Sequence, residues 1–96
     1  MAKRDPSLHS LYQLFAAVDT PREAEMLLQD LLTPEEVASI SGRWQLIRML
    51  DEGVPQREIA EEIGLSISKI TRGSRMLQFG SGGFLYFLKK LRKKSR

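Results

Sequence analysis

Apolar residues recur every three or four positions along much of this chain, which is the spacing of one face of a helix. The first such face ends where Asp19 and Thr20 interrupt it, and it consists of Leu8, Leu11, Tyr12, Phe15 and Val18. The pattern predicts an amphipathic helix near residues 8–18 and favours an all-α fold.

Two short segments mark the starts of further helices. Residues 20–23 and 33–36 both read as threonine, proline, any residue and glutamate. This is a capping box, in which the threonine caps the helix, the proline takes the first helical position and the glutamate the third. The helix that begins at the second of these boxes is predicted to run from Pro34 to about Glu52 and to end at Gly53.

Residues 56–77, QREIAEEIGLSISKITRGSRML, have the spacing of a helix-turn-helix. Ala60 is small enough to let the second helix cross closely, and Gly64 supplies the positive φ of a sharp helix exit. Ser66 can cap the second helix. The two helices share an apolar face made of Ile59, Ile63, Leu65, Ile70 and Leu77.

The second helix of the motif has an outer face suited to DNA. On a 3.6-residue period Ile70, Gly73, Ser74 and Leu77 point inward, and the outer face holds hydroxyls and arginines without an acid. Such groups bond phosphates, and the first turn can enter a major groove. The alternative is a solvated helix in an ordinary bundle. The candidate DNA contacts are Arg57, Ser66, Ile67, Ser68, Lys69, Thr71 and Arg75.

The chain ends in a glycine-rich turn at residues 80–83 and a short predicted helix at 84–94. The turn lacks the Lys-Ser or Lys-Thr of a phosphate-cradling loop. The last eight residues hold six of the fifteen cations, so residues 1–88 carry a net charge of −3 and any DNA-binding field must be local. The tail is a possible second contact, and its apolar side leaves open an alternative as a membrane-surface helix.

Composition predicts one domain over residues 1–96, divided into a helical dimerisation part (1–53), the helix-turn-helix (54–78) and a C-terminal part (79–96). There is no cysteine, and His9 has no neighbouring ligand residue. We expect no metal site and no enzyme activity. No signal peptide or apolar span appears, so a cytoplasmic location is expected.

Several separated motifs resemble the tryptophan repressor family. They are LLTPEE at 31–36, Arg43 in GRWQLIRMLDEG, QREIAEE at 56–62 and above all ITRGS at 70–74. The run LQFGSGGF at 77–84 resembles a broader repressor-like group. The resemblance implies a transcriptional repressor that binds double-stranded DNA and uses L-tryptophan as a possible corepressor.

The resemblance also implies a tryptophan site. Arg43 and Arg72 match the arginines on either side of the indole, and Asp30 and Leu32 match the carbonyls that receive the ammonium group. Thr33 matches a threonine near the carboxylate, and Gly73 a glycine beside the ring. Met76 stands where the repressor has a serine, and Ala60 where it has a lysine facing DNA. The alternatives are another ligand or none, with Arg43 paired to Glu35 or Glu36 and Arg72 on a phosphate.

The N-terminal half carries more apolar surface than one short chain readily covers. Besides the first helix, Leu27, Leu28, Leu31 and Leu32 crowd one segment. The resemblance implies an intertwined helical homodimer, for which the operator is a pseudo-palindrome with half-sites about one helical turn, ~34 Å, apart. The alternative is a compact monomer.

Overall fold

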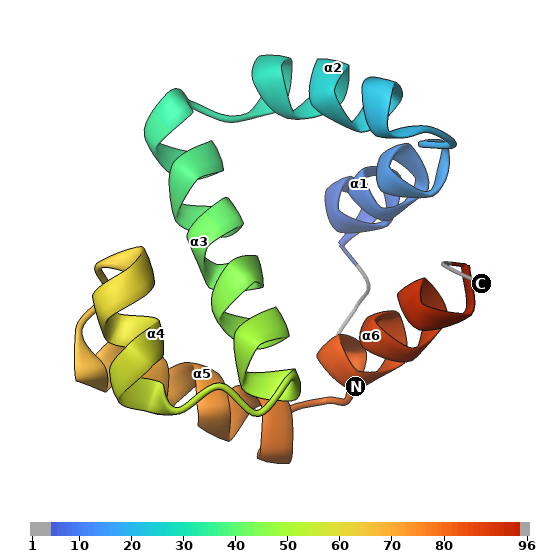
Figure 1. Cartoon of the computed structure of the whole chain (residues 1–96). Helices are drawn as coiled ribbons and strands as arrows, with labels where there is room; N and C mark the ends of the chain where they lie inside the picture. The colour runs from blue at the N-terminus through green and yellow to red at the C-terminus, as the bar shows by residue number, and fades with distance from the viewer. Residues whose placement is uncertain (1–4, 95–96) are drawn as a thin grey trace. The chain divides into compact units, whose positions relative to one another are not determined.

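The fold is all-α over the described part of the chain. A computed structural model describes residues 5–94 and shows six helices in them and no strand (Figure 1). In chain order these are α1 (Pro6–Ala16), α2 (Pro21–Leu31), α3 (Pro34–Asp51), α4 (Gln56–Ile63), α5 (Ile67–Phe79) and α6 (Gly83–Lys94). The all-α prediction is confirmed.

The chain divides into two compact units, residues 1–37 and 38–96. The first unit holds α1 and α2. Asp5 caps α1 by accepting the Ser7 N–H at 2.9 Å. α1 ends two residues before Val18, because the Ala17 and Val18 N–H groups bond carbonyls three residues back and tighten the last turn. No residue of α1 or α2 is buried.

Both predicted capping boxes are present. The Thr20 Oγ1 accepts the Glu23 N–H at 3.1 Å, and the Glu23 carboxylate reaches back to the Asp19 N–H at 2.9 Å. In the second box the Thr33 Oγ1 accepts the Glu36 N–H at 3.1 Å, and the Glu36 carboxylate accepts the N–H of the cap residue Thr33 itself at 2.9 Å. Each box satisfies N–H groups that a helix start leaves without a partner.

The second unit contains the hydrophobic core. Leu46 of α3, Ile59 of α4 and Ile70 of α5 are at most 2% exposed and pack together. The turn that leads from α3 into α4 depends on Gly53, whose φ is 83°. The Gly53 N–H bonds the Leu50 carbonyl and the Val54 N–H the Met49 carbonyl, so α3 ends in a Schellman motif.

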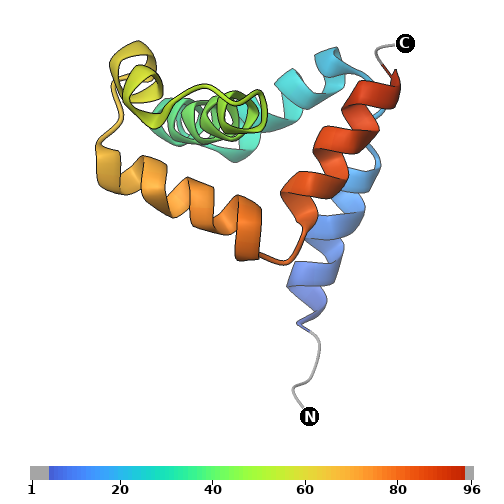
Figure 2. The same cartoon turned by 60° about the horizontal axis from the view of Figure 1, so that its bottom comes forward.

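α6 follows α5 after a short glycine-rich connection in which Gly82 has a φ of 95° (Figure 2). Leu88 is 6% exposed, and the Phe84 ring stacks on the Trp44 ring with centroids 6.3 Å apart. Near the end of α6 the Arg92 guanidinium bonds the Asp51 carboxylate. These contacts tie α6 to α3.

Candidate nucleic-acid interface

α4 and α5 form the predicted helix-turn-helix. Gly64 ends α4 in the left-handed region, at φ 68° and ψ 24°, and its N–H bonds the Ala60 carbonyl at 3.0 Å. Ala60 is half-buried and packs against the core cluster, as its small size predicts. α4 and α5 pack against each other, so the turn sets the position of α5.

The N-terminus of α5 is capped and exposed. Ser66 accepts the Lys69 N–H at 3.3 Å, and the Ser66 and Ser68 hydroxyl oxygens lie 3.2 Å apart. The first turn contains no acid. Its N–H groups and the helix dipole favour an anion at this end, such as a phosphate.

The inner face of α5 is the one predicted from its period. Ile70 and Gly73 are buried, and Ser74 and Leu77 are half-buried. Gly73 lies so close to α3 that a Cβ there would stand 2.7 Å from the Leu46 Cδ2. The glycine therefore has a packing role that the sequence did not reveal.

The predicted DNA contacts all lie at the surface. They are Arg57 on α4, the cap residue Ser66, and Ile67, Ser68, Lys69, Thr71 and Arg75 on α5, and each is exposed. Within residues 5–94, none of the three cations in this set forms an ion pair. Their charge is therefore not neutralised by a neighbouring side chain.

Within the helix-turn-helix, exposed acids lie on α4 and not on α5. α4 carries three exposed acids, Glu58, Glu61 and Glu62, and Arg57 lies beside them in sequence. Of the helix-turn-helix, the part best suited to a polyanion is therefore the start of α5, with Arg57 at its margin.

The residues implied for tryptophan fall on both units. Asp30, Leu32 and Thr33 belong to the first unit, and Arg43, Arg72, Gly73 and Met76 to the second. Arg43 and Arg72 are exposed and form no ion pair within the described residues. Thr33 already caps α3. The tryptophan site itself stays a prediction.

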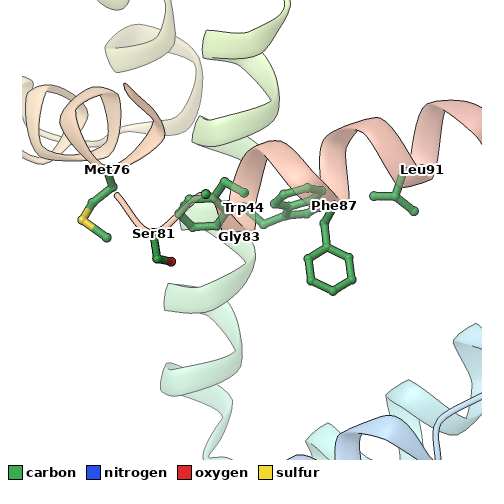
Figure 3. Close-up of a pocket in the computed structure, with 8 residues that line it drawn as sticks. Trp44, Met76, Ser81, Gly83, Phe87 and Leu91 are labelled. Atoms are coloured by element: carbon green, nitrogen blue, oxygen red, sulfur yellow. The ribbon is translucent and has the colours of Figure 1, made fainter. Parts of the chain in front are cut away.

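A groove that sequence reasoning missed lies beside Met76 in the second unit. It has a volume of about 510 Å³ and is shown in Figure 3. Its lining is Trp44, Met76, Ser81, Gly82, Gly83, Phe84, Phe87 and Leu91. No charged side chain lines it. Trp44 is 40 residues from Phe84, so no local pattern could have paired these two rings.

Within the described residues, no buried side-chain nitrogen or oxygen lacks a hydrogen-bond partner, and no group of three potential metal ligands occurs. Of the helices between residues 5 and 94, none is both long and apolar enough to span a bilayer.

Comparison with known sequences gives consistent matches. The family described as "Trp repressor protein" matches residues 6–92. A Trp operon repressor homolog of Mannheimia succiniciproducens is 45% identical over 65 residues, which are 67% of this chain and 64% of that protein. One from Chlamydia trachomatis serovar L2 is 40% identical over 84 residues, 82% of this chain and 89% of the relative.

Two solved structures share the fold. One is a candidate Trp repressor from Staphylococcus aureus, with a TM-score of 0.86 and 28% identity over 93% of this chain and 89% of that chain. The other is a TrpR-like protein from Eubacterium eligens, also with a TM-score of 0.86 and 28% identity, over 92% of this chain and 91% of the other.

The predicted repressor resemblance and the assignment as a non-enzyme are thereby confirmed, and the resemblance of the glycine-rich segment to a broader group stays a prediction. With the helix-turn-helix geometry and the match over residues 6–92, this chain belongs to the Trp repressor family of DNA-binding transcription regulators.

Proposed function

We propose that this protein is a homodimeric repressor that binds a pseudo-palindromic operator in double-stranded DNA. The observation that carries the proposal is the start of α5, which is exposed, free of acids and held in place by a buried Ile70. Phosphate contacts there set the register on the duplex, and side chains of the first turn read base edges. A repressor works where the chromosome is, so the expected location is the cytoplasm.

Exposed apolar surface in the first unit supports the homodimer. Five large apolar side chains of α1 and two of α2 are each more than a third exposed: Leu8, Leu11, Tyr12, Leu14, Phe15, Met26 and Leu31. Exposed apolar side chains in this number are rarely left open in a monomer. A second copy of the chain covers it in the proposed assembly, and two α5 helices then read half-sites about one helical turn, ~34 Å, apart.

The test of DNA recognition is selection of a binding site from random duplexes, followed by titration at several salt concentrations. Arg57→Ala should weaken binding by about 1–3 kcal/mol and relax the preference at one base position, as loss of a guanine contact would. The matched control is Arg22→Ala, because Arg22 is exposed but already paired with Glu25 at 2.5 Å. Equal affinity of both variants for the selected site would contradict the docking.

We further propose L-tryptophan as the corepressor. Two exposed guanidiniums, Arg43 and Arg72, support this because a guanidinium stacks on aromatic rings and also binds carboxylate. Tryptophan that fixes α5 in a groove-ready orientation would raise DNA affinity, and DNA would raise tryptophan affinity by the same factor.

Calorimetry with L-tryptophan, in the presence and absence of the selected duplex, tests this coupling. Arg43→Ala and Arg72→Ala should each reduce it. Met76→Ser should strengthen tryptophan binding, since a hydroxyl can accept a hydrogen bond from the ammonium group. If millimolar tryptophan leaves DNA affinity unchanged in both wild type and Met76→Ser, the corepressor proposal fails and the DNA-binding proposal stands.

The second candidate is a repressor that is constitutive or answers to another ligand. It is favoured by Met76, because its thioether is only a weak acceptor at the position where the resemblance implies a serine. In this case the selected operator is bound equally well without any amino acid.

A further inference from the structure

Glu62 is the last acidic residue in the sequence. Residues 63–94 carry eight cations and no carboxylate side chain. Three of these cations lie on α5, and the other five lie on α6. The acid-free stretch therefore has two separate concentrations of positive charge, and the proposed operator contact uses only the first.

Contacts with α3 fix which side of α6 faces outward. Leu88 is buried, the Phe84 ring stacks on the Trp44 ring, and Arg92 is paired with Asp51. On a helical period, Lys89, Lys90 and Lys93 lie on the side opposite Leu88. They and Lys94 are exposed and form no ion pair within residues 5–94.

An exposed tyrosine lies among these lysines. Tyr86 is 60% exposed, and the Lys90 Nζ stands 5.9 Å from the centroid of its ring. A tyrosine hydroxyl donates to phosphate oxygens, and lysines bind phosphates as point charges. We name Tyr86, Lys89, Lys90, Lys93 and Lys94 the α6 basic face.

We propose that the α6 basic face is a second DNA-binding surface, which contacts backbone phosphates outside the half-site read by α5. The proposal rests on the proposed function, because it adds a contact to the same duplex. α5 has 13 residues and is about 20 Å long, and α6 follows its C-terminal end. A duplex covers that length in roughly six base pairs. Contacts with these backbone phosphates raise the affinity for every DNA sequence and do not distinguish one sequence from another.

Phosphate is a better match for this face than a lipid surface. An interfacial helix inserts its apolar side among lipid chains. In α6 part of that side, Phe84 and Leu88, already packs against the protein. The four lysines, by contrast, need no rearrangement to meet a polyanion.

The experiment compares the full-length chain with two quadruple variants. In one, Lys89, Lys90, Lys93 and Lys94 are replaced by Gln; in the other, all four are replaced by Arg, which keeps the charge. Fluorescence anisotropy measures binding to the selected site alone, to the same site extended at both ends, and to a nonspecific duplex, each over a salt series. Circular dichroism checks that helicity is retained, with the double variant Lys89→Gln, Lys93→Gln as a milder alternative.

Extension of the duplex should increase affinity for wild type and the Arg variant, and not for the Gln variant. Each lost phosphate contact lowers the salt slope by about 0.9, so loss of one per chain, which is two per dimer, makes the wild-type advantage about 10-fold larger at 50 mM than at 200 mM salt. Binding to the nonspecific duplex should weaken in parallel.

The two proposals fail separately. If the Gln variant binds the selected site with the salt slope and length dependence of wild type, the α6 basic face is not a DNA surface and the proposed function stands. If no site can be selected but nonspecific binding still depends on the four lysines, the proposed function fails, and the α6 basic face is a DNA surface without a half-site beside it. Loss of binding to phosphatidylserine vesicles without change on DNA would overturn the inference in favour of a membrane surface.

Discussion

The two units of this chain are both helical, but only one of them has a core of its own. In the second unit Leu46, Ile59 and Ile70 are almost completely excluded from water. In α1 and α2 of the first unit no side chain is buried, although the segment is rich in leucine and aromatic residues. Hydrophobic burial is the dominant favourable term in folding. The second unit therefore has a stabilising core that α1 and α2 lack.

Side-chain caps, in contrast, occur in both units. Thr20 and Thr33 cap the helices that begin in the first unit, and Ser66 caps α5 in the second. Caps contribute about 1 kcal/mol each, whereas an isolated helix of about eleven residues is marginal in water. Side-chain caps thus define where these helices start in both units. The two units differ in their tertiary packing.

The largest effect should come from a charge in the apolar surface of the first unit. Leu31→Asp on α2 should abolish association and folding together, because a second copy can no longer cover α1 and α2 without burying an unpaired carboxylate. For wild type, the unfolding temperature should rise with protein concentration. Sedimentation and thermal unfolding over a concentration series measure both quantities.

Gln29→Asp is the matched control for this change. It adds the same carboxylate to α2 at an exposed polar position, so it should leave assembly intact. A monomeric mass for wild type with a concentration-independent midpoint would show that the first unit is stable without a partner.

A smaller effect is expected in the core of the second unit. Ile70→Ala should lower the free energy of unfolding by about 2–5 kcal/mol, since it removes buried methyl groups and leaves a cavity. The control is one turn away: Ile67 is 55% exposed, so Ile67→Ala should change stability by no more than about 0.5 kcal/mol. Urea unfolding at one protein concentration compares them. Equal losses would mean that Ile67 is buried in the functional assembly.

The sequence predicted those features that depend on neighbouring residues. The capping boxes, the Gly64 exit, the Ser66 cap and the inner face at Ile70 and Gly73 follow from short-range hydrogen bonding and helical period, and the structure contains them all. The exposure of the predicted DNA contacts follows for the same reason. Within the candidate site, Gly64 and Ser66 fix the backbone of the turn, so the helix-turn-helix could be predicted from the sequence.

Features that join distant residues could not be predicted in this way. The Trp44–Phe84 stack and the Asp51–Arg92 pair each link positions about forty residues apart, and no period or motif connects them. They depend on how α6 turns back toward α3. The same holds for Gly73, whose lack of a side chain is explained by Leu46 on another helix.

The smallest expected effect is a difference in stability between variants of two glycines, Gly42 and Gly73, which lie inside helices of the second unit. At Gly73 a Cβ would stand 2.7 Å from the Leu46 Cδ2, and Leu46 is 2% exposed and packs in the core with Ile59 and Ile70. At Gly42 a Cβ would meet nothing within 4 Å. Alanine gains about 0.5–1 kcal/mol over glycine in a helix, whereas overpacking a core costs about 1–3 kcal/mol.

Gly42→Ala should therefore raise the free energy of unfolding by about 0.5–1 kcal/mol, and Gly73→Ala should lower it. Urea unfolding without tryptophan measures both changes at one protein concentration. Because no ligand is present, a loss at Gly73 reports contact with Leu46 and not space for an indole ring. If Gly73→Ala is as stable as Gly42→Ala in this assay, α5 can move away from α3 and the packing role of Gly73 is wrong.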